Sequence, residues 1–246
     1  MRILIVNKFL YLRGGDCVHS LNLKQLLRNA GHDVCFYAMS YSQNIVCEEN
    51  KYFAEEISFS AKDLQGKIKA ASRIIWGIGV VQNFKKLLEE FQPDVVHLNN
   101  IHSYLSPIVA KLAYQRGVKV IWTLHDYKLI CPSYSCLCKR NTCEACFTDK
   151  KHVVLRKCMK NSFPASILAW GEAMNWNKNK LSLWTNSFIC PSQFMAEKMQ
   201  QGGYPASKLQ VISNFIGEEQ VQYIINTPNP IREEAYAYIG RLSQEK

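Results

Sequence analysis

The chain has 246 residues, of which 48% are hydrophobic and 20% charged, and its formal net charge is +10 at pH 7. This composition excludes a disordered or low-complexity chain and provides enough apolar residues for one large domain or two small ones. No window reaches the roughly 18 consecutive apolar residues that a membrane-spanning helix requires. The positive charge favours an anionic partner, such as nucleic acid, a phosphorylated ligand or an acidic membrane surface, although it also fits a merely well-solvated surface.

The N-terminal part of the chain is predicted to alternate buried strands with helices. A strand at Arg2–Val6 leads through Gly14 and Gly15 into an amphipathic helix at 16–30, and a second strand follows at 33–38. The start, MRILIVNKF, is too short for a secretory signal and runs directly into a strand, so we expect a cytoplasmic protein. A glycine turn before a helix can present backbone N–H groups to a phosphate, but two adjacent glycines are equally typical of a plain turn.

The next elements complete the pattern of a parallel sheet. A helix at 62–91, broken near Gly77 and Gly79, precedes a third strand at Val95–Leu98. A further helix at 104–116 leads to the apolar run GVKVIWTLHDY at 117–127, which is typical of a strand buried on both faces. Four strands separated by helices predict an α/β, Rossmann-like, doubly wound and mainly parallel sheet. The buried face of the helix at 62–91 is expected to contain Ile74, Ile75, Ile78 and Val81.

Polar residues follow the third and fourth strands. His97, Asn99, Asn100 and His102 lie at the end of the third strand, and His125 follows the fourth. In open α/β sheets the ligand lies just outside the carboxyl ends of the strands, so an imidazole there is placed for chemistry. A histidine that only caps a loop would occupy the same position, and the position alone does not separate the two interpretations.

The segment 131–158 is predicted to be a Cys-rich insertion, because it holds six of the ten cysteines. In a cytosolic chain, clustered cysteines bind metal more often than they form disulfides. Cys143 and Cys146 form a CxxC pair, and with Cys131 and Cys158 they would give four thiolates for a closed, structural zinc site. Because the spacing is not that of two CxxC pairs, disulfides, redox chemistry and free thiols stay open.

The segment 162–183 is rich in aromatic residues and is flanked by lysines. It predicts either core packing or an amphipathic surface that lies on a membrane interface. After it come a short strand at 188–190, a helix at Gln193–Gln201 with Ser192 as its N-cap, and a strand at 209–212.

The order of these motifs resembles the family 4 glycosyltransferases of the GT-B fold. The matching pieces are RILIVNKF with the glycine pair, PDVVHLNN at 93–100, TLHDYKLICP at 123–132, CEAC at 143–146 with Cys158, ICPSQFM at 189–195, KLQVISNFI at 208–216 and YIGRLSQEK at 238–246. They cover essentially the whole chain. The resemblance implies the N-terminal half of a GT-B architecture, in which two Rossmann-like domains face each other across a cleft.

The resemblance also implies an activity. It indicates a retaining glycosyltransferase of the hexosyltransferase type that moves a sugar from a UDP- or GDP-sugar to a glycan or lipid-linked acceptor in cell-envelope polysaccharide synthesis. No catalytic metal is obligatory, and structural zinc and peripheral contact with the inner face of the plasma membrane are the further expectations. We expect no nucleic-acid partner, because no recognised nucleic-acid-binding motif accompanies the charge.

The same resemblance implies roles for single residues. His125 matches the histidine that lies against the donor sugar. Arg241 and Lys246 match the basic pair that holds the donor diphosphate, and the turn at Gly14 and Gly15 approaches the same phosphates. The N-terminal domain chiefly binds the acceptor, and the residues that we assign to acceptor binding are Asn99, His102, Asp126 and Tyr127.

The chain is expected to contain one complete domain and only the beginning of a second. Residues 1–226 form the acceptor-binding domain, 227–234 form a linker marked by Pro228 and Pro230, and 235–246 begin a C-terminal donor-binding domain. We therefore expect the 246-residue chain alone to be inactive. The alternative is a non-catalytic Rossmann-type module that binds an anionic ligand or a membrane surface. The substitution His125→Ala separates the two, since it would change turnover in an enzyme and only affinity in a binding module.

Overall fold

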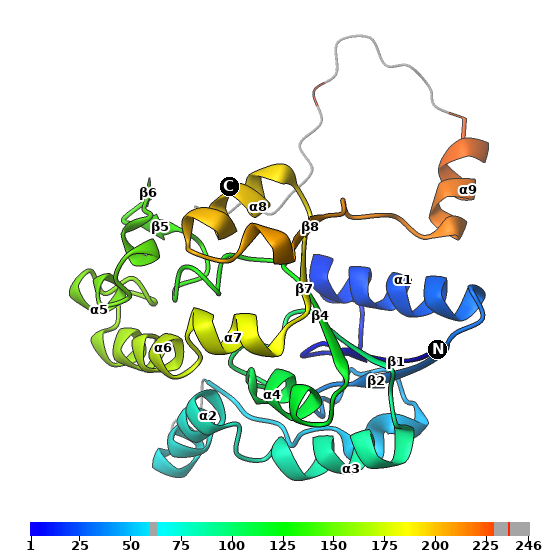
Figure 1. The fold of residues 1–246 in the computed structure, drawn as a ribbon, viewed down its shortest axis with the longest axis horizontal. Coiled ribbons are helices and arrows are strands. Elements are labelled where there is room, and N and C mark those ends of the chain that lie inside the picture. Colours follow the sequence, from blue (N-terminus) through cyan, green and yellow to red (C-terminus); the bar gives the residue numbers. More distant parts are fainter. Residues whose placement is uncertain (60–62, 229–235, 237–246) are drawn as a thin grey trace.

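The computed structural model describes residues 1–59, 63–228 and 236 (Figure 1). A six-stranded sheet with the strand order β2-β1-β3-β4-β7-β8 forms its centre, and every neighbouring pair of strands is parallel. The predicted Rossmann-like, doubly wound sheet is confirmed. The strands are β1 (Arg2–Val6), β2 (Asp33–Tyr37), β3 (Val95–Leu98), β4 (Lys119–Thr123), β7 (Ser187–Cys190) and β8 (Leu209–Val211).

Alternate residues of β1 and β2 pack into two separate hydrophobic clusters, one on each face of the sheet. In β1, Ile3 and Ile5 belong to one hydrophobic cluster, whereas Leu4 and Val6 belong to the other. A strand that is covered on both faces needs apolar side chains in both directions, and this is why RILIV has no polar alternation. The continuous apolar runs of the sequence are therefore the direct cause of the buried parallel sheet.

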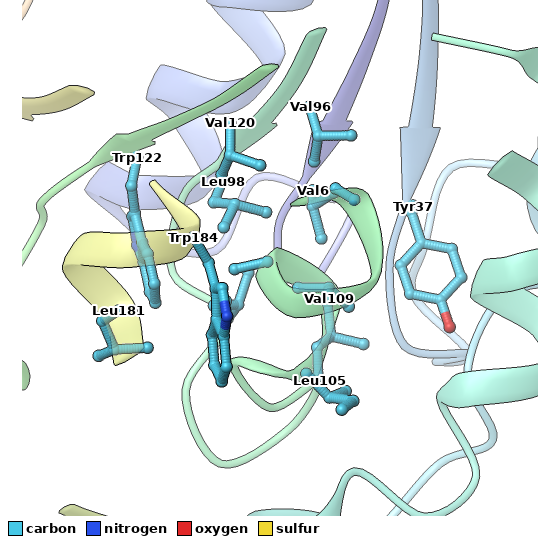
Figure 2. Packing of buried hydrophobic residues seen from close by; sticks show 14 of the residues in the cluster. Val6, Tyr37, Val96, Leu98, Leu105, Val109, Val120, Trp122, Leu181 and Trp184 are labelled. Atoms are coloured by element: carbon cyan, nitrogen blue, oxygen red, sulfur yellow. The ribbon is translucent and has the colours of Figure 1, made fainter. Parts of the chain in front are cut away.

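Helices cover both faces of the sheet (Figure 1). α1 (Gly15–Asn29) lies on one face, and α3 (Val81–Phe91), α4 (Ile108–Gln115) and α7 (Lys178–Trp184) lie on the other. Figure 2 shows the second core, in which Val109 of α4 and Trp184 of α7 pack beneath Leu98 and Val120 of the sheet.

The predicted break near Gly77 and Gly79 is confirmed. α2 (Leu64–Trp76) ends at Gly77, whose φ is +70°, and Gly79 has a φ of +81°. These left-handed conformations suit glycine, and they turn the chain into α3. The predicted burial of Ile78 is wrong: this side chain is 57% exposed because it lies in the turn between the two helices, whereas Ile74 is 4% exposed.

Two other helices differ from the prediction. The helix predicted at 104–116 begins later, at Ile108, because Ser106 has a left-handed φ of +69° and Pro107 precedes the first helical residue. The aromatic segment at 162–183 forms two helices, α6 (Phe163–Asn175) and α7, and the side chain of Asn177 caps the second by accepting a hydrogen bond from Lys180 N at 3.2 Å.

The remaining elements flank the sheet. Ser192 caps α8 (Gln193–Gln201) as predicted, since its Oγ accepts a hydrogen bond from Met195 N at 3.2 Å. The sequence did not predict α9 (Glu218–Asn226). Among the described residues, no helix combines the length and the apolarity needed to cross a membrane. These elements are the hairpin β5 (Leu137–Cys138) and β6 (Asn141–Thr142), α5 (His152–Leu155), α8 (Gln193–Gln201), α9 (Glu218–Asn226) and the 3₁₀ turns Glu48–Tyr52, Ala145–Phe147 and Ala206–Lys208.

The predicted linker at 227–234 and the predicted start of a C-terminal domain at 235–246 lie outside the described residues, apart from positions 227, 228 and 236. The division of the chain into domains therefore stays a prediction.

Candidate active site

The strand order places a candidate site at the carboxyl edge of the sheet. β1 is followed by Lys8, β3 by Asn99 and Asn100, and β4 by His125 and Asp126. β1 and β3 are neighbours although they are not consecutive in the chain, so the strand order reverses beside them. In open parallel sheets this switch point is where ligands bind. The predicted polar residues after β3 and β4 therefore lie where the fold favours a site.

Asn99 orients the imidazole of His125. The Nε2 atom of His125 lies 3.0 Å from Asn99 Oδ1, and because the amide oxygen accepts, Nε2 carries the proton in this arrangement. Asn99 is itself fixed, since its N–H donates to Val6 O at 2.9 Å and its carbonyl accepts from Trp122 Nε1 at 3.0 Å. The other ring nitrogen of His125, Nδ1, is then an acceptor.

The surroundings keep His125 neutral. Burial lowers the pKa of its imidazole to about 4. Repulsion from His19, when that ring is protonated, and from Lys8 acts in the same direction, while Asp16 opposes them. The His19 ring lies 5.0 Å from the His125 ring, edge to face, and Phe215 lies 5.2 Å from His19 on an edge-to-face contact of its own. At neutral pH His125 is therefore available as a neutral hydrogen-bonding group and not as a cation.

The N-terminus of α1 faces this site. Gly14 is the N-cap and makes no side-chain hydrogen bond to the first turn, which carries Asp16. Asp16 forms an ion pair with Lys8 at 3.4 Å, and its Oδ2 atom is buried with no hydrogen-bond partner among the described residues. A helix N-terminus attracts anions, but the Asp16 carboxylate opposes one here. The phosphate-binding role of Gly14 and Gly15 stays a prediction.

The four predicted acceptor residues do not all belong to one site. His102 stacks on Trp122 with ring centroids 5.3 Å apart, and burial lowers the pKa of His102. Asp126 Oδ1 accepts a hydrogen bond from Lys128 N at 2.8 Å, and burial raises the pKa of the Asp126 carboxyl. Tyr127 instead packs against the hydrophobic core. A small hollow brings the others together, and it is lined by Asn99, Asn100, His102, Trp122, Thr123, Leu124, His125, Asp126 and Leu129.

The structure does not bring the four predicted zinc ligands together as one group, and the structural zinc site stays a prediction. No group of three or more His, Cys, Asp or Glu side chains within the described part of the chain is arranged to hold a metal ion. The thiol of Cys131 interacts with the thiols of Cys136 and Cys146, whereas Cys143 accepts a hydrogen bond from Arg156 at 3.1 Å. Cys158 interacts with Cys138, which the prediction did not include. All ten cysteines are free.

Arg241 and Lys246 lie outside the described residues, so their role at the donor diphosphate stays a prediction. Sequence reasoning missed Asp16, His19 and Phe215 at this site. A usable signal existed for His19, since it lies one helical turn after Gly15 and therefore on the same face of α1 as the first residue of the helix.

The sequence family settles the broad class of the protein. Residues 13–220 match the model of Glycosyltransferase Family 4. The chain belongs to this family. The match includes the glycine at position 14, both polar strand ends and the whole Cys-rich insertion, so the resemblance seen in the motifs is confirmed.

A curated relative of this family 4 chain is an uncharacterized glycosyltransferase of Methanosarcina acetivorans. It is 36% identical over 107 residues, which cover 40% of this chain and 28% of the relative. Among solved structures, the chain is similar to UDP-GlcNAc 2-epimerase of Neisseria meningitidis bound to UDP-GlcNAc, with a TM-score of 0.46 and 12% identity over 87% of this chain and 47% of that one. It is also similar to MurG of Acinetobacter baumannii, with a TM-score of 0.44 and 12% identity over 89% of this chain and 47% of that one. The family 4 chain thus spans less than half the length of these proteins.

Proposed function

We propose that this family 4 chain is the acceptor-binding part of a retaining glycosyltransferase that uses a UDP- or GDP-sugar as donor. The observation that carries the proposal is the His125 and Asn99 pair, which lies at the sheet edge opposite the α1 N-terminus in a chain of this family. A neutral, oriented imidazole can accept a hydrogen bond from a donor-sugar hydroxyl through Nδ1 and hold the sugar for attack.

Asp126 adds a second function at the same edge. Its Oδ1 is held by Lys128 N, so the other carboxylate oxygen is available to accept a hydrogen bond from the reacting hydroxyl of an acceptor. The raised pKa of the Asp126 carboxyl makes it a better proton acceptor than an ordinary aspartate. The donor sugar held by His125 and the acceptor hydroxyl held by Asp126 would then meet at two adjacent residues of the loop after β4.

Turnover of sugar nucleotides tests the proposal. UDP- and GDP-sugars would be screened with extracted cell-envelope lipids as acceptors, using the 246-residue chain and any longer chain that continues past Lys246. We expect transfer that His125→Ala lowers by on the order of a hundredfold or more, with donor affinity changed much less. A His125→Ala variant that loses ligand affinity but shows no loss of turnover would favour a non-catalytic binding module.

We also propose that the protein works at the inner face of the plasma membrane, from the cytoplasmic side. Four large apolar side chains recur at helical spacing on α6 and are solvent-exposed: Phe163 is 51%, Ile167 43%, Trp170 38% and Met174 51% exposed. Exposed cations on the preceding segment include Lys151, Arg156, Lys157 and Lys160. An apolar stripe beside cations suits an anionic lipid surface.

Flotation with vesicles tests the membrane contact. Vesicles that contain phosphatidylglycerol should carry the wild-type protein with them, and neutral phosphatidylcholine vesicles should not. Trp170→Glu should abolish flotation, whereas Ile225→Glu on the distant helix α9, where the side chain is 69% exposed, should leave it unchanged (Figure 1). Equal losses in both variants would contradict a contact through α6.

A further inference from the structure

A pocket of about 190 Å³ lies beside the His125 hollow. Its walls come from the loops after β3 and β4, from the Cys-rich insertion and from α6 and α7. His102 and Leu129 line both the pocket and the hollow, so the two spaces adjoin. Of the predicted functional residues, only His102 lines the described pocket. Which ligand the pocket binds can therefore be tested separately from the role of His125.

A buried ion pair forms the polar wall of this pocket. Lys128 Nζ lies 2.8 Å from Glu172 Oε2, and the two side chains are 7% and 5% exposed. Lys128 Nζ also donates to Pro132 O at 2.7 Å. The second carboxylate oxygen, Glu172 Oε1, is buried and has no hydrogen-bond partner among the described residues. Buried polar atoms normally have partners, so a ligand hydroxyl is the group that would complete this wall.

The charge of the pocket favours an anion. Lys128, Lys150 and Lys178 line it against the single carboxylate of Glu172. The ammonium of Lys150 is held by Ile130 O, which fixes it at the wall, and Lys178 is exposed. Because Glu172 neutralises Lys128, the charges of the other two lysines leave the pocket with a net positive charge. An anionic group would therefore be attracted to Lys150 and Lys178.

The remaining wall is apolar and suits a sugar ring. Trp176 is 8% exposed and fixed by its Nε1–H, which donates to Ile74 O at 2.8 Å. Phe147 from the insertion and Leu181 from α7 complete this side. Ligand pockets typically combine such apolar walls with a few polar groups that set the orientation. A hydroxyl for Glu172, an anion for the lysines and an apolar face for Trp176 together describe an acidic sugar.

We propose that this space, the Glu172 pocket, binds a sugar that carries a phosphate or carboxylate group and belongs to the acceptor. This proposal rests on the proposed transferase function. The hydroxyl that reacts would extend through the boundary at His102 toward His125. The Cys-rich insertion then has a role in substrate recognition, because it supplies Phe147 and Lys150 to the pocket.

Direct binding to the 246-residue chain tests the pocket without any transfer assay. The probes are glucose 6-phosphate, glucuronic acid, neutral glucose and inorganic phosphate, followed by calorimetry and by the tryptophan fluorescence that Trp176 contributes. We expect the two acidic sugars to bind about tenfold more tightly than either glucose or phosphate alone. Binding of phosphate as tight as that of glucose 6-phosphate, or of glucose as tight as that of the acidic sugars, would overturn the proposal.

Matched variants locate the binding. Lys178→Glu should weaken the acidic sugars by about tenfold, whereas Lys85→Glu, at an exposed position of α3, should not. Ala173→Phe, which adds a ring at the pocket wall, should abolish binding, and its thermal midpoint shows whether it is folded. Equal effects of the two lysine variants would overturn the proposal.

The two proposals can fail separately. Transfer that depends on His125, together with no binding of the acidic sugars, would overturn the pocket and leave the proposed function standing. Binding that depends on Lys178, in a protein that transfers no sugar in any longer form, would support the pocket as a ligand site and contradict the proposed function.

Discussion

The buried imidazole of His97 is expected to make the fold sensitive to mild acid. His97 lies in β3 with only 8% of its surface exposed, and its Nε2 lies 2.8 Å from Thr123 Oγ1 in β4. Burial lowers the pKa of His97 to about 3, and repulsion from His19 and His125, when those rings are protonated, acts in the same direction. The informative perturbation is His97→Gln, which keeps a polar side chain and removes the titration.

The magnitude follows from the shifted pKa. An unfolded histidine titrates near pH 6.5, so below that pH the unfolded chain gains a proton that the folded chain cannot bind. The folded state is therefore most stable above pH 6.5 and loses stability as the pH falls toward the folded pKa of about 3. Between neutral pH and about pH 5.5, His97 alone should lower the free energy of unfolding by roughly 1 kcal/mol.

Urea unfolding at the two pH values, followed by tryptophan fluorescence, measures this contribution. We expect His97→Gln to show a pH effect smaller than that of the wild type by roughly 1 kcal/mol. Thr123→Val keeps the imidazole and removes only its partner, so its pH effect should match the wild type. The other histidines with lowered pKa values, His19, His102 and His125, contribute equally to all three proteins. A His97→Gln variant with the full wild-type pH effect would refute the reasoning.

Three further predictions concern stability and orientation. Gly77→Ala should lower the free energy of unfolding by about 2 kcal/mol or more, because a Cβ there would lie 2.4 Å from Ile108 Cγ2 at a φ of +70°. Gly31→Ala, with a φ of +80° but no atom within 4 Å, should cost only about 1 kcal/mol, and urea unfolding compares the two. Glu172→Leu leaves the buried Lys128 ammonium unpaired and should cost about 3–5 kcal/mol in the same assay, most of which the double variant with Lys128→Met should restore. Asn99→Ala frees the His125 ring and should lower kcat for sugar transfer by on the order of tenfold or more, while Asn29→Ala, at the exposed C-terminal end of α1, serves as the matched control. Similar kcat values for wild type and Asn99→Ala would argue against an orienting role.

The sheet and its main breaks could be predicted from the sequence because their causes are local. A strand covered on both faces needs a continuous apolar run, and RILIV at Arg2–Val6 is such a run. The turn between α2 and α3 needs left-handed backbone, and Gly77 and Gly79 supply it. Each of these signals lies within a few residues of the structure that it predicts.

The Cys-rich insertion gives no such signal. It contains no glycine, yet Tyr134, Cys136, Lys139 and Arg140 all have left-handed φ values between +49° and +71°. Glycine, asparagine and aspartate are the residues that normally indicate a left-handed backbone, so the sequence does not predict these turns. The hairpin of β5 and β6 and the grouping of the thiols follow from this backbone. Sequence reasoning therefore did not anticipate that Cys131 lies with Cys136 and Cys146, and Cys158 with Cys138.

The candidate site could be predicted only in part, for a related reason. His125 and Asn99 were identified because each follows its own strand, and parallel strands end at one edge. His19 and Phe215 reach the same place from α1 and from the segment after β8, and no local pattern links those segments to β4. The pairing of Lys128 with Glu172 likewise depends on how α6 packs against the loop after β4.

The site combines a part that the sheet holds in place with a part that the Cys-rich insertion supplies, and we expect these two parts to change independently. The backbone bonds of Asn99 to Val6 and the indole of Trp122 tie His125 to the centre of the sheet, where a substitution would disturb the core. Phe147 and Lys150 come from an insertion outside the sheet, although Phe147 also packs against the main hydrophobic core. Exchange of the segment 131–158 for that of another family 4 member should therefore alter which acidic sugar binds, while the His125 geometry and the free energy of unfolding of the sheet change little. If the exchange removed the His125-dependent step as well, the insertion would be part of the catalytic framework and not a separable wall.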